Sequence, residues 1–260
     1  MISIDHIRAF YPDFMSRSQA FSVHVLKEYV QLLILDYLAS TRYARKIVFI
    51  GGTNLRLAKG IDRFSEDLDF DCKDLGREEF AALSGDVVAF LRRNGMEADA
   101  REKDSSRLTA FRSSIHFPGL LFNMGLSAHR EARFMIKLEA QDQGVGYEPT
   151  SAFIKGCGLF FSFPVPPDSV LCSMKIAAML SRAKGRDFYD AMFLLAQTQP
   201  DYDFLSARCG IRDLSGLKSA VEDRLRSVDL RQKQRDFEHL LFHGDNSKRI
   251  LQAGEFFKSL

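Results

Sequence analysis

Apolar residues recur at helical spacing in two long segments of the chain. From 22 to 40 they stand three or four positions apart, at Val23, Leu26, Val30, Leu33 and Tyr37. The same period runs from 77 to 94, where Asn94-Gly95 is typical of a helix end. Because this period places apolar side chains on one face of an α-helix, the pattern predicts two long amphipathic helices.

Other segments carry the pattern of β-strands. The run 46–50 is apolar and β-branched and stops at Gly51-Gly52, which predicts a strand followed by a turn. Strict alternation from 133 to 141 places Lys137 and Glu139 on one face and, on the other, Phe134, Ile136, Leu138 and Ala140. Further strands are expected over 67–71, 96–103 and 108–117.

Helical patterns dominate the chain after the proline-rich stretch 163–167. They are expected near 168–183, 186–198, 214–228 and 231–259, the last with a break at Gly244. Strands mixed with helices before this stretch, and helices alone after it, predict an α+β fold. We therefore divide the chain into a mixed domain, 1–165, and a helical domain, 166–260.

Composition and charge leave the function open. Basic and acidic residues nearly cancel, 36 against 34, for a net charge of +2, so a nucleic-acid contact needs a local basic surface. The candidates for that surface are Arg182, Lys184, Arg186, Arg224, Arg226, Arg231, Lys233 and Arg235. No apolar run approaches the ~20 residues that cross a bilayer, and the cysteines lack C-x-x-C spacing. We expect a cytoplasmic protein with reduced thiols and no membrane contact.

The strand expected over 67–71 carries the most informative chemistry. Asp67 and Asp69 alternate along it, so their carboxylates share a face and repel each other. A hard divalent cation such as Mg²⁺ or Mn²⁺ would relieve this repulsion and also bind substrate phosphates. With Glu139 from the later strand, they form the carboxylate trio that a two-metal phosphoryl-transfer site needs. A surface strand with solvated aspartates is the alternative interpretation.

Residues before this strand are candidates for binding the phosphates of a nucleotide. A pair of glycines allows the backbone to approach a triphosphate closely, and Thr53 or Asn54 could cap a short helix whose free N–H groups face the turn. The candidate phosphate ligands are Gly51, Gly52, Thr53, Arg56, Arg63 and Ser65. Each arginine could instead form an ordinary salt bridge, and Ser65 could cap the loop.

A second group of charged residues lies on the helices expected after 168. Lys175 and Arg182 are seven positions apart, hence on one helical face and about 10 Å from each other along the axis. Such a face could span a triphosphate, although this spacing is also typical of a solvated helix face. Asp187 and Asp190 fall in the first turn of the next helix, where the helix dipole favours acids. Capping and catalysis are therefore both open for them.

Three of these segments together resemble the AbiEii/AbiGii toxin family, bacterial nucleotidyltransferases of the DNA polymerase β-like superfamily. The stretch from Gly51-Gly52-Thr53 to Arg63-x-Ser65-x-Asp67-Leu68-Asp69 is similar to the family's glycine and Asp-x-Asp motifs. The segment 134–139 is similar to its third strand, and 175–190 resembles its late helical signature. Thr53 and Glu139 depart from the Ser and Asp that are common at these positions.

The resemblance implies a polymerase β-like palm, a mixed sheet with flanking helices, followed by a helical domain that completes the active-site cleft. It implies an abortive-infection toxin that uses an NTP with Mg²⁺ and is encoded alongside an antitoxin. Some members add nucleotides to the acceptor end of tRNA. At the matching positions, the resemblance implies metal binding by Asp67 and Asp69, active-site roles for Lys137 and Glu139, and nucleotide or hydroxyl contacts for Lys175 and Asp187.

We therefore expect an Mg²⁺-dependent nucleotidyltransferase that transfers a nucleotide from an NTP to RNA, such as the acceptor end of tRNA. The same residues fit transfer to a hydroxyl group of a protein or a small molecule. A non-catalytic nucleotide-binding regulator has less need of the complete carboxylate trio. A metal-dependent nuclease would leave the glycine pair and Lys175 without an explanation.

Overall fold

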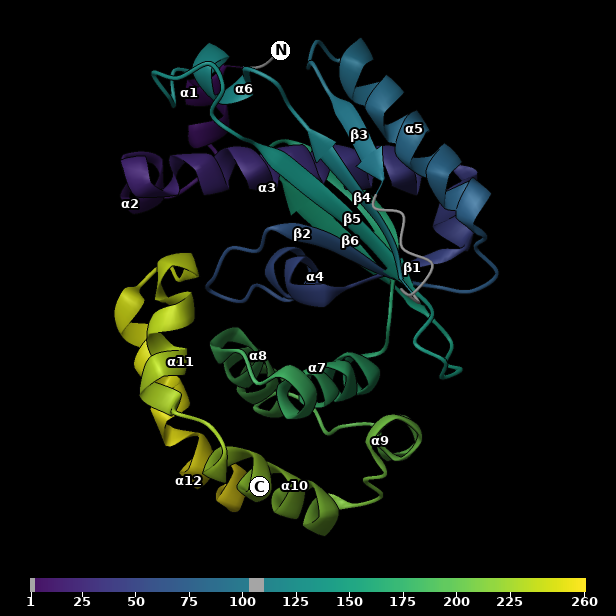
Figure 1. Cartoon of the computed structure of the whole chain (residues 1–260), viewed down its shortest axis with the longest axis vertical. Helices are drawn as coiled ribbons and strands as arrows, with labels where there is room; N and C mark the ends of the chain where they lie inside the picture. The colour runs from purple at the N-terminus through teal and green to yellow at the C-terminus, as the bar shows by residue number, and fades with distance from the viewer. Residues whose placement is uncertain (1–2, 103–109) are drawn as a thin grey trace. The chain divides into compact units, whose positions relative to one another are not determined.

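The computed structural model describes residues 3–102 and 110–260, and the chain divides into two compact units (Figure 1). The first unit comprises Met1–Gly60, Phe64–Gln143 and Pro149–Val165. The second unit is Pro166–Leu260 together with two short segments from earlier in the chain, Ile61–Arg63 and Gly144–Glu148. The boundary between the two units therefore falls in the proline-rich stretch. No feature of the sequence predicted that the two short segments belong to the second unit.

A five-stranded mixed sheet forms the centre of the first unit. Its order is β1-β2-β5-β4-β3, in which β2 and β5 run parallel and the other neighbours antiparallel. The bounds are Ile47–Ile50 for β1, Asp67–Cys72 for β2, Asp99–Glu102 for β3, Phe111–His116 for β4 and Met135–Gln141 for β5. Residues 103 and 108–109, which were included in the expected strands, lie outside the described part. The mixed sheet with flanking helices confirms the predicted α+β class.

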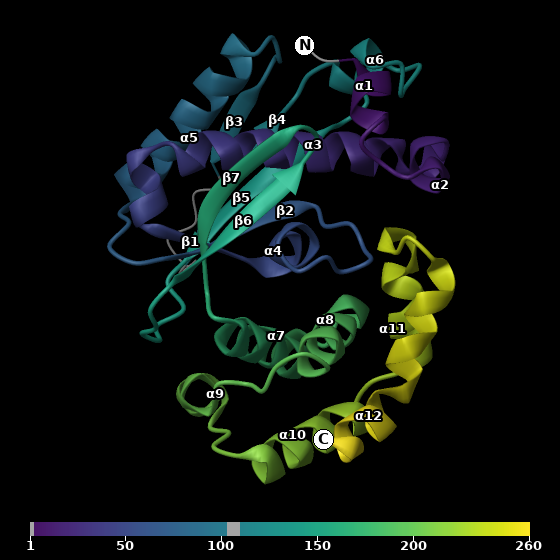
Figure 2. The same ribbon diagram turned by 180° about the vertical axis from the view of Figure 1, so that it is seen from behind.

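One face of this sheet is covered by apolar side chains. Helix α5 (Arg77–Arg93) lies beside β3 and β4 in both views (Figures 1 and 2), and its Ser84 hydroxyl is 2.6 Å from that of Ser113 on β4. Leu68, Phe70 and the predicted apolar face of β5 are buried. Because side chains alternate along a strand, the charged residues of β2, β5 and β4 lie on the opposite face.

A β-hairpin that the sequence did not indicate covers part of the same apolar face. It consists of β6 (Thr150–Gly156) and β7 (Leu159–Val165), and Phe163 packs with its ring centroid 6.0 Å from that of Phe49 and 6.1 Å from that of Phe70. The pattern was missed because the exposed side of the hairpin also carries large apolar residues, Phe153 and Phe160, which removes the polar-apolar alternation.

The remaining helices of the first unit flank the sheet or begin the chain. The long helix predicted over 22–40 is α3, Gln19–Ala39, and the others are α1 (Ile4–Arg8), α2 (Asp13–Ser16), the 3₁₀ turn η1 (Arg42–Arg45), α4 (Gly51–Leu57) and α6 (Leu120–Asn123). All four cysteines are free thiols. Within the described residues, none of the helices is long and apolar enough to span a membrane.

The described residues of the second unit form helices and connecting loops. They are α7 (Asp168–Arg182), α8 (Gly185–Leu195), α9 (Tyr202–Cys209), α10 (Leu214–Arg226), α11 (Leu230–Phe237), the 3₁₀ segments η2 (Glu238–Leu240) and η3 (Gly244–Gln252), and α12 (Ala253–Ser259). The expected helix over 231–259 is thus divided into several pieces. One cause is the early segment Ile61–Arg63, since Asn246 donates a hydrogen bond of 2.6 Å to Asp62 and Arg63 forms a β-bridge with Leu241.

Candidate active site

Gly51 stands where β1 passes directly into α4, next to the aspartates of β2. Ile50 pairs with Asp69 across the sheet, and Gly51 has a φ of +83°. A Cβ atom at this position would lie 2.1 Å from Oδ2 of Asp69, far inside van der Waals contact. Glycine is therefore needed here both for the left-handed backbone and for the space that the Asp69 carboxylate occupies. Close approach to a triphosphate stays a prediction for Gly51 and Gly52.

The residues after the glycines anchor α4 to the strands. The predicted cap by Thr53 or Asn54 is wrong, because α4 begins at Gly51 with Ile50 as its N-cap residue. Both side chains are fully buried; the Thr53 hydroxyl donates to the carbonyl of Asp67, and the Asn54 amide donates to the carbonyl of Phe49 at 2.7 Å. Thr53 thus fixes the backbone of the residue that carries the first candidate metal ligand.

The aspartates of β2 and the charged residues of β5 lie opposite each other in register. Asp67 pairs with Lys137 and Asp69 pairs with Glu139, and the Nζ atom of Lys137 is 3.7 Å from Oδ1 of Asp67. All four side chains are partly exposed and lie on the face of the sheet opposite its apolar face. The structure therefore brings together four of the predicted catalytic residues.

Glu139 has a cationic partner that sequence reasoning missed. Arg112 on β4 pairs with it in register, and its Nε atom is 3.2 Å from Oε2 of Glu139. Among the residues that the structure describes, no group of three or more His, Cys, Asp or Glu side chains is arranged to hold a metal ion. Metal binding by Glu139 together with Asp67 and Asp69 therefore stays a prediction. Strict alternation along the strand expected over 108–117 would have placed Arg112 on this face.

The third aspartate of β2 supports the structure of the sheet end. Asp71 is 2% exposed, and its Oδ1 accepts a hydrogen bond of 3.0 Å from the backbone N–H of Gln143. This bond ties the end of β2 to the chain that leaves β5. A carboxylate held in this way serves the scaffold, whereas Asp67 and Asp69 keep partial exposure on the same strand.

Two candidate phosphate ligands contact other residues of the first unit. The Arg56 guanidinium donates to both carboxylate oxygens of buried Glu28, at 2.7 and 3.1 Å. The backbone carbonyl of Ser65 accepts from the side-chain amide of Gln31 at 3.2 Å. The salt-bridge alternative therefore describes Arg56 in this structure, and nucleotide binding stays a prediction for both residues.

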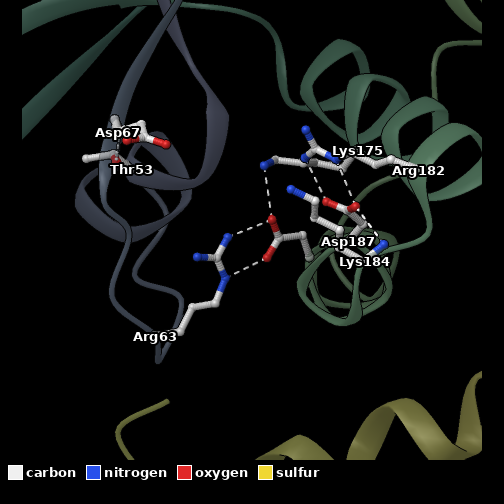
Figure 3. A network of polar contacts seen from close by, with 8 residues as sticks. Thr53, Arg63, Asp67, Lys175, Arg182, Lys184 and Asp187 are labelled. Carbon is white, nitrogen blue, oxygen red and sulfur yellow. Dashed lines mark hydrogen bonds and ion pairs between the residues drawn. The ribbon is translucent and has the colours of Figure 1, made fainter. Parts of the chain in front are cut away.

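In the second unit, two cations share one buried carboxylate. Arg63 donates to both oxygens of Asp190 at 2.7 Å, and the Nζ atom of Lys175 is 3.0 Å from the same group (Figure 3). All three side chains are buried. Burial acts to raise the pKa of Asp190, but Arg63 and Lys175 outweigh it and hold this pKa at about 2. With two positive groups and one negative, the triad has a net charge of +1.

Asp187, a predicted catalytic residue, caps helix α8. Its carboxylate is fully buried and accepts two hydrogen bonds from Arg182, at 2.9 and 2.7 Å, and one of 3.1 Å from the backbone N–H of Lys184 (Figure 3). These contacts favour capping over catalysis for Asp187. Arg182 keeps nearly half of its side chain exposed, so a nucleotide contact by Arg182 stays a prediction.

Replacing Gly51 with Ala is expected to destabilise the protein and to displace the Asp69 side chain. Strain at a left-handed residue costs about 1–3 kcal/mol, and the clash with the carboxylate adds to it. The matched control is Gly60→Ala, where φ is +74° but no atom lies within 4 Å of the added Cβ. Urea unfolding of the two variants should show a clearly larger loss for Gly51→Ala; equal losses would contradict the close approach of Asp69.

The chain matches one known protein family and is similar in fold to several solved structures. The model of the family described as nucleotidyl transferase AbiEii toxin, type IV toxin-antitoxin system, matches residues 33–247. The solved structure of the MenT4 nucleotidyltransferase toxin from Mycobacterium tuberculosis H37Rv has a TM-score of 0.61 and 18% identity, over 100% of this chain and 91% of that chain. JHP933 from Helicobacter pylori has a TM-score of 0.56 and 19% identity, over 91% and 90%. Comparison with curated proteins gave no match.

Proposed function

The chain belongs to the AbiEii nucleotidyl transferase toxin family of type IV toxin-antitoxin systems, and on this premise we propose that it transfers a nucleotide from an NTP to an RNA hydroxyl, such as the acceptor end of tRNA. The observation that carries the proposal is the register of β2 and β5, which places Asp67 and Asp69 opposite Lys137 and Glu139. Carboxylates of this kind, with a lysine beside them, suit phosphoryl transfer.

The residues present fit a divalent cation. Asp67 and Asp69 supply hard oxygen donors on one face of β2, and the missing Cβ of Gly51 leaves room for the Asp69 carboxylate. Mg²⁺ or Mn²⁺ prefers such donors and completes its coordination with substrate phosphates and water. When bound, it would supply neutralisation of the charge that develops on the phosphates.

The protein's own groups orient the reactants in the proposed reaction. The acceptor hydroxyl oxygen forms a bond to the α-phosphorus, the bond from that phosphorus to the bridging oxygen breaks, and pyrophosphate leaves with the bonding electrons. The hydroxyl proton passes to a carboxylate of the β2 and β5 group. Lys137, 3.7 Å from Asp67, provides a positive charge for the phosphate oxygens.

The toxin family implies an antitoxin as partner. We propose that the antitoxin counteracts the transfer reaction.

Transfer to a protein or to a small-molecule hydroxyl is the second candidate function, because the carboxylates of β2 and β5 do not by themselves select the acceptor. A regulator that binds a nucleotide without catalysis is the third.

Incubation of the purified protein with total RNA, Mg²⁺ and each α-labelled NTP in turn tests the proposal. We expect label in an RNA band of tRNA size with at least one NTP, and none with the Asp67→Asn variant. Label in protein would favour the alternative acceptor. Absence of label in every fraction, in the presence of folded protein that binds NTP, would favour the non-catalytic regulator.

A further inference from the structure

The charged face of the five-stranded sheet carries polar residues in rows that cross the strands. One row joins Asp69 to Glu139 and Arg112, and a second joins Asp67 to Lys137. The second row continues to Ser114 on β4 and Arg101 on β3. Strand pairing fixes these positions, and the second row runs from the candidate metal ligand Asp67 on β2 across β5 and β4 to β3, the edge strand of the sheet (Figure 1).

A hollow of about 520 Å³ lies at the end of this surface. His116 of β4 borders it, together with Arg101, Arg130 and Arg133. His116 pairs with Met135, two residues before Lys137, and β4 is the second strand from β2. At strand spacings of about 4.8 Å and a rise of about 3.4 Å per residue, the backbone of His116 is about 12 Å from that of Asp67.

The arginines of this hollow differ from Arg56, Arg63, Arg112 and Arg182, the arginines of the candidate active site. Arg56, Arg63, Arg112 and Arg182 each form an ion pair with a carboxylate. Within 3–102 and 110–260, Arg101, Arg130 and Arg133 form no such ion pair, although Glu97 and Glu131 also border the hollow. Burial, followed by the charges of Arg101 and Arg133, lowers the pKa of His116, whereas the charge of Asp99 acts in the opposite direction.

We propose that Arg101, Arg130 and Arg133 form the surface that holds the RNA acceptor beside the candidate active site; this inference rests on the proposed function. Guanidinium groups bind phosphate with two parallel hydrogen bonds and stack on unpaired bases. The hollow is bordered by His116, whose backbone is about 12 Å from that of Asp67, and this separation suits nucleotides that neighbour the reacting one.

Two of the arginines favoured by the sequence, Arg224 and Arg226, fit this role less well. Arg224 donates to the backbone carbonyls of Leu180 and Ser181 at the end of α7, and Arg226 pairs with Glu222 and Asp223. These guanidinium groups already have acceptors within the second unit. The arginines around the hollow therefore offer phosphate-binding groups without breaking existing ion pairs.

The test compares two triple charge reversals of the full chain. Arg101→Glu, Arg130→Glu and Arg133→Glu change the proposed surface, while Lys73→Glu, Arg93→Glu and Lys155→Glu make the same change in net charge at other exposed positions of the first unit. The probe is an end-labelled tRNA mixture, whose binding is followed by fluorescence anisotropy between about 50 and 200 mM salt. Binding of an NTP with Mg²⁺ is measured separately by calorimetry.

We expect the surface variant to lose at least about tenfold in RNA affinity at low salt, and the slope of log affinity against log salt to fall by about 2–3, the value for three phosphate contacts. NTP binding should not change, and the control variant should bind RNA nearly as the parent does. Equal effects of the two variants, or an equal loss of NTP and RNA binding, would overturn the proposal. If the reversed variant does not fold, the Arg→Gln triple variant, with about half the change in charge, provides the same comparison.

The RNA measurement separates this inference from the proposed function. RNA binding that depends on the three arginines, in a protein that transfers no nucleotide, would support the surface and refute the transferase. Nucleotide transfer to a protein, with RNA affinity equal in the parent and the surface variant, would refute the surface and leave the transferase in place.

Discussion

Replacing either Asp67 or Asp69 with Asn is expected to abolish nucleotide transfer and to leave the fold intact. The two carboxylates share one face of β2 and remain partly exposed, so each substitution removes a charge from a repelling pair without opening a cavity. A ligand of a catalytic cation contributes several kcal/mol to the transition state, and we expect transfer to fall by on the order of 10³-fold or more.

The same strand supplies a matched control for this prediction. Asp71→Asn keeps an oxygen that can accept the N–H of Gln143, and it should retain transfer within several-fold of the parent. Labelled-NTP assays measure transfer, and thermal melts with and without Mg²⁺ and NTP measure binding. Near-normal transfer by Asp67→Asn, or a loss of the fold in that variant, would refute the metal-site interpretation.

Replacing Asp190 with Asn is expected to cause the largest loss of stability. The substitution leaves Arg63 and Lys175 buried without their shared counter-charge, and breaking a buried ion pair by removing one partner costs about 3–5 kcal/mol. Lys175→Met should cost less, because Arg63 still binds both oxygens of Asp190. Adding Lys175→Met to Asp190→Asn should recover part of the loss, since it removes one of the uncompensated charges.

Urea unfolding of the parent, the two single variants and the double variant measures these differences as a double-mutant cycle. Additive losses would show that Lys175 and Asp190 do not interact in solution. A loss below about 1 kcal/mol for Asp190→Asn would contradict the buried triad, because exposed ion pairs contribute no more than this.

The Asp190 pair also predicts a pH dependence. Its pKa is lowered from 3.8 to about 2, so the unfolded state binds a proton more readily than the folded state. The resulting stability is fully present above about pH 4 and is lost as the pH falls through about 2. The parent should therefore lose more stability than Asp190→Asn between pH 4 and 2; parallel curves would contradict the shift.

The strand that carries Asp67 and Asp69 is predictable because its pattern is local. Alternation within 67–71 and 133–141 decides which side chains share a face, and Leu68, Phe70, Ile136 and Leu138 are buried as that alternation requires. The hairpin β6–β7 has large apolar residues on both of its faces, including Phe153 and Phe160. The two strands were missed because their sequences lack the alternation of polar and apolar residues that is typical of a strand with one exposed face.

Roles that depend on distant partners could not be predicted. The glycine at position 51 was recognised as part of a sequence motif. Only the structure shows that the group next to it is the carboxylate of Asp69 on the adjacent strand. Arg112 and Glu139 meet because β4 and β5 pair in a particular register. The sequence gives no register for strands whose connection is long, since many alignments keep the same faces buried.

By itself, the sequence determined the fold class, the family resemblance and the charged face of β2 and β5, because each depends on residues close together in the chain. Only the tertiary structure decided that Arg63, predicted to bind phosphate, is bound to Asp190, 127 positions later. It also decided that Asp187 accepts from Arg182 and caps α8. The sequence shows which residues are charged, but the packing of distant segments decides which buried partner neutralises each of them.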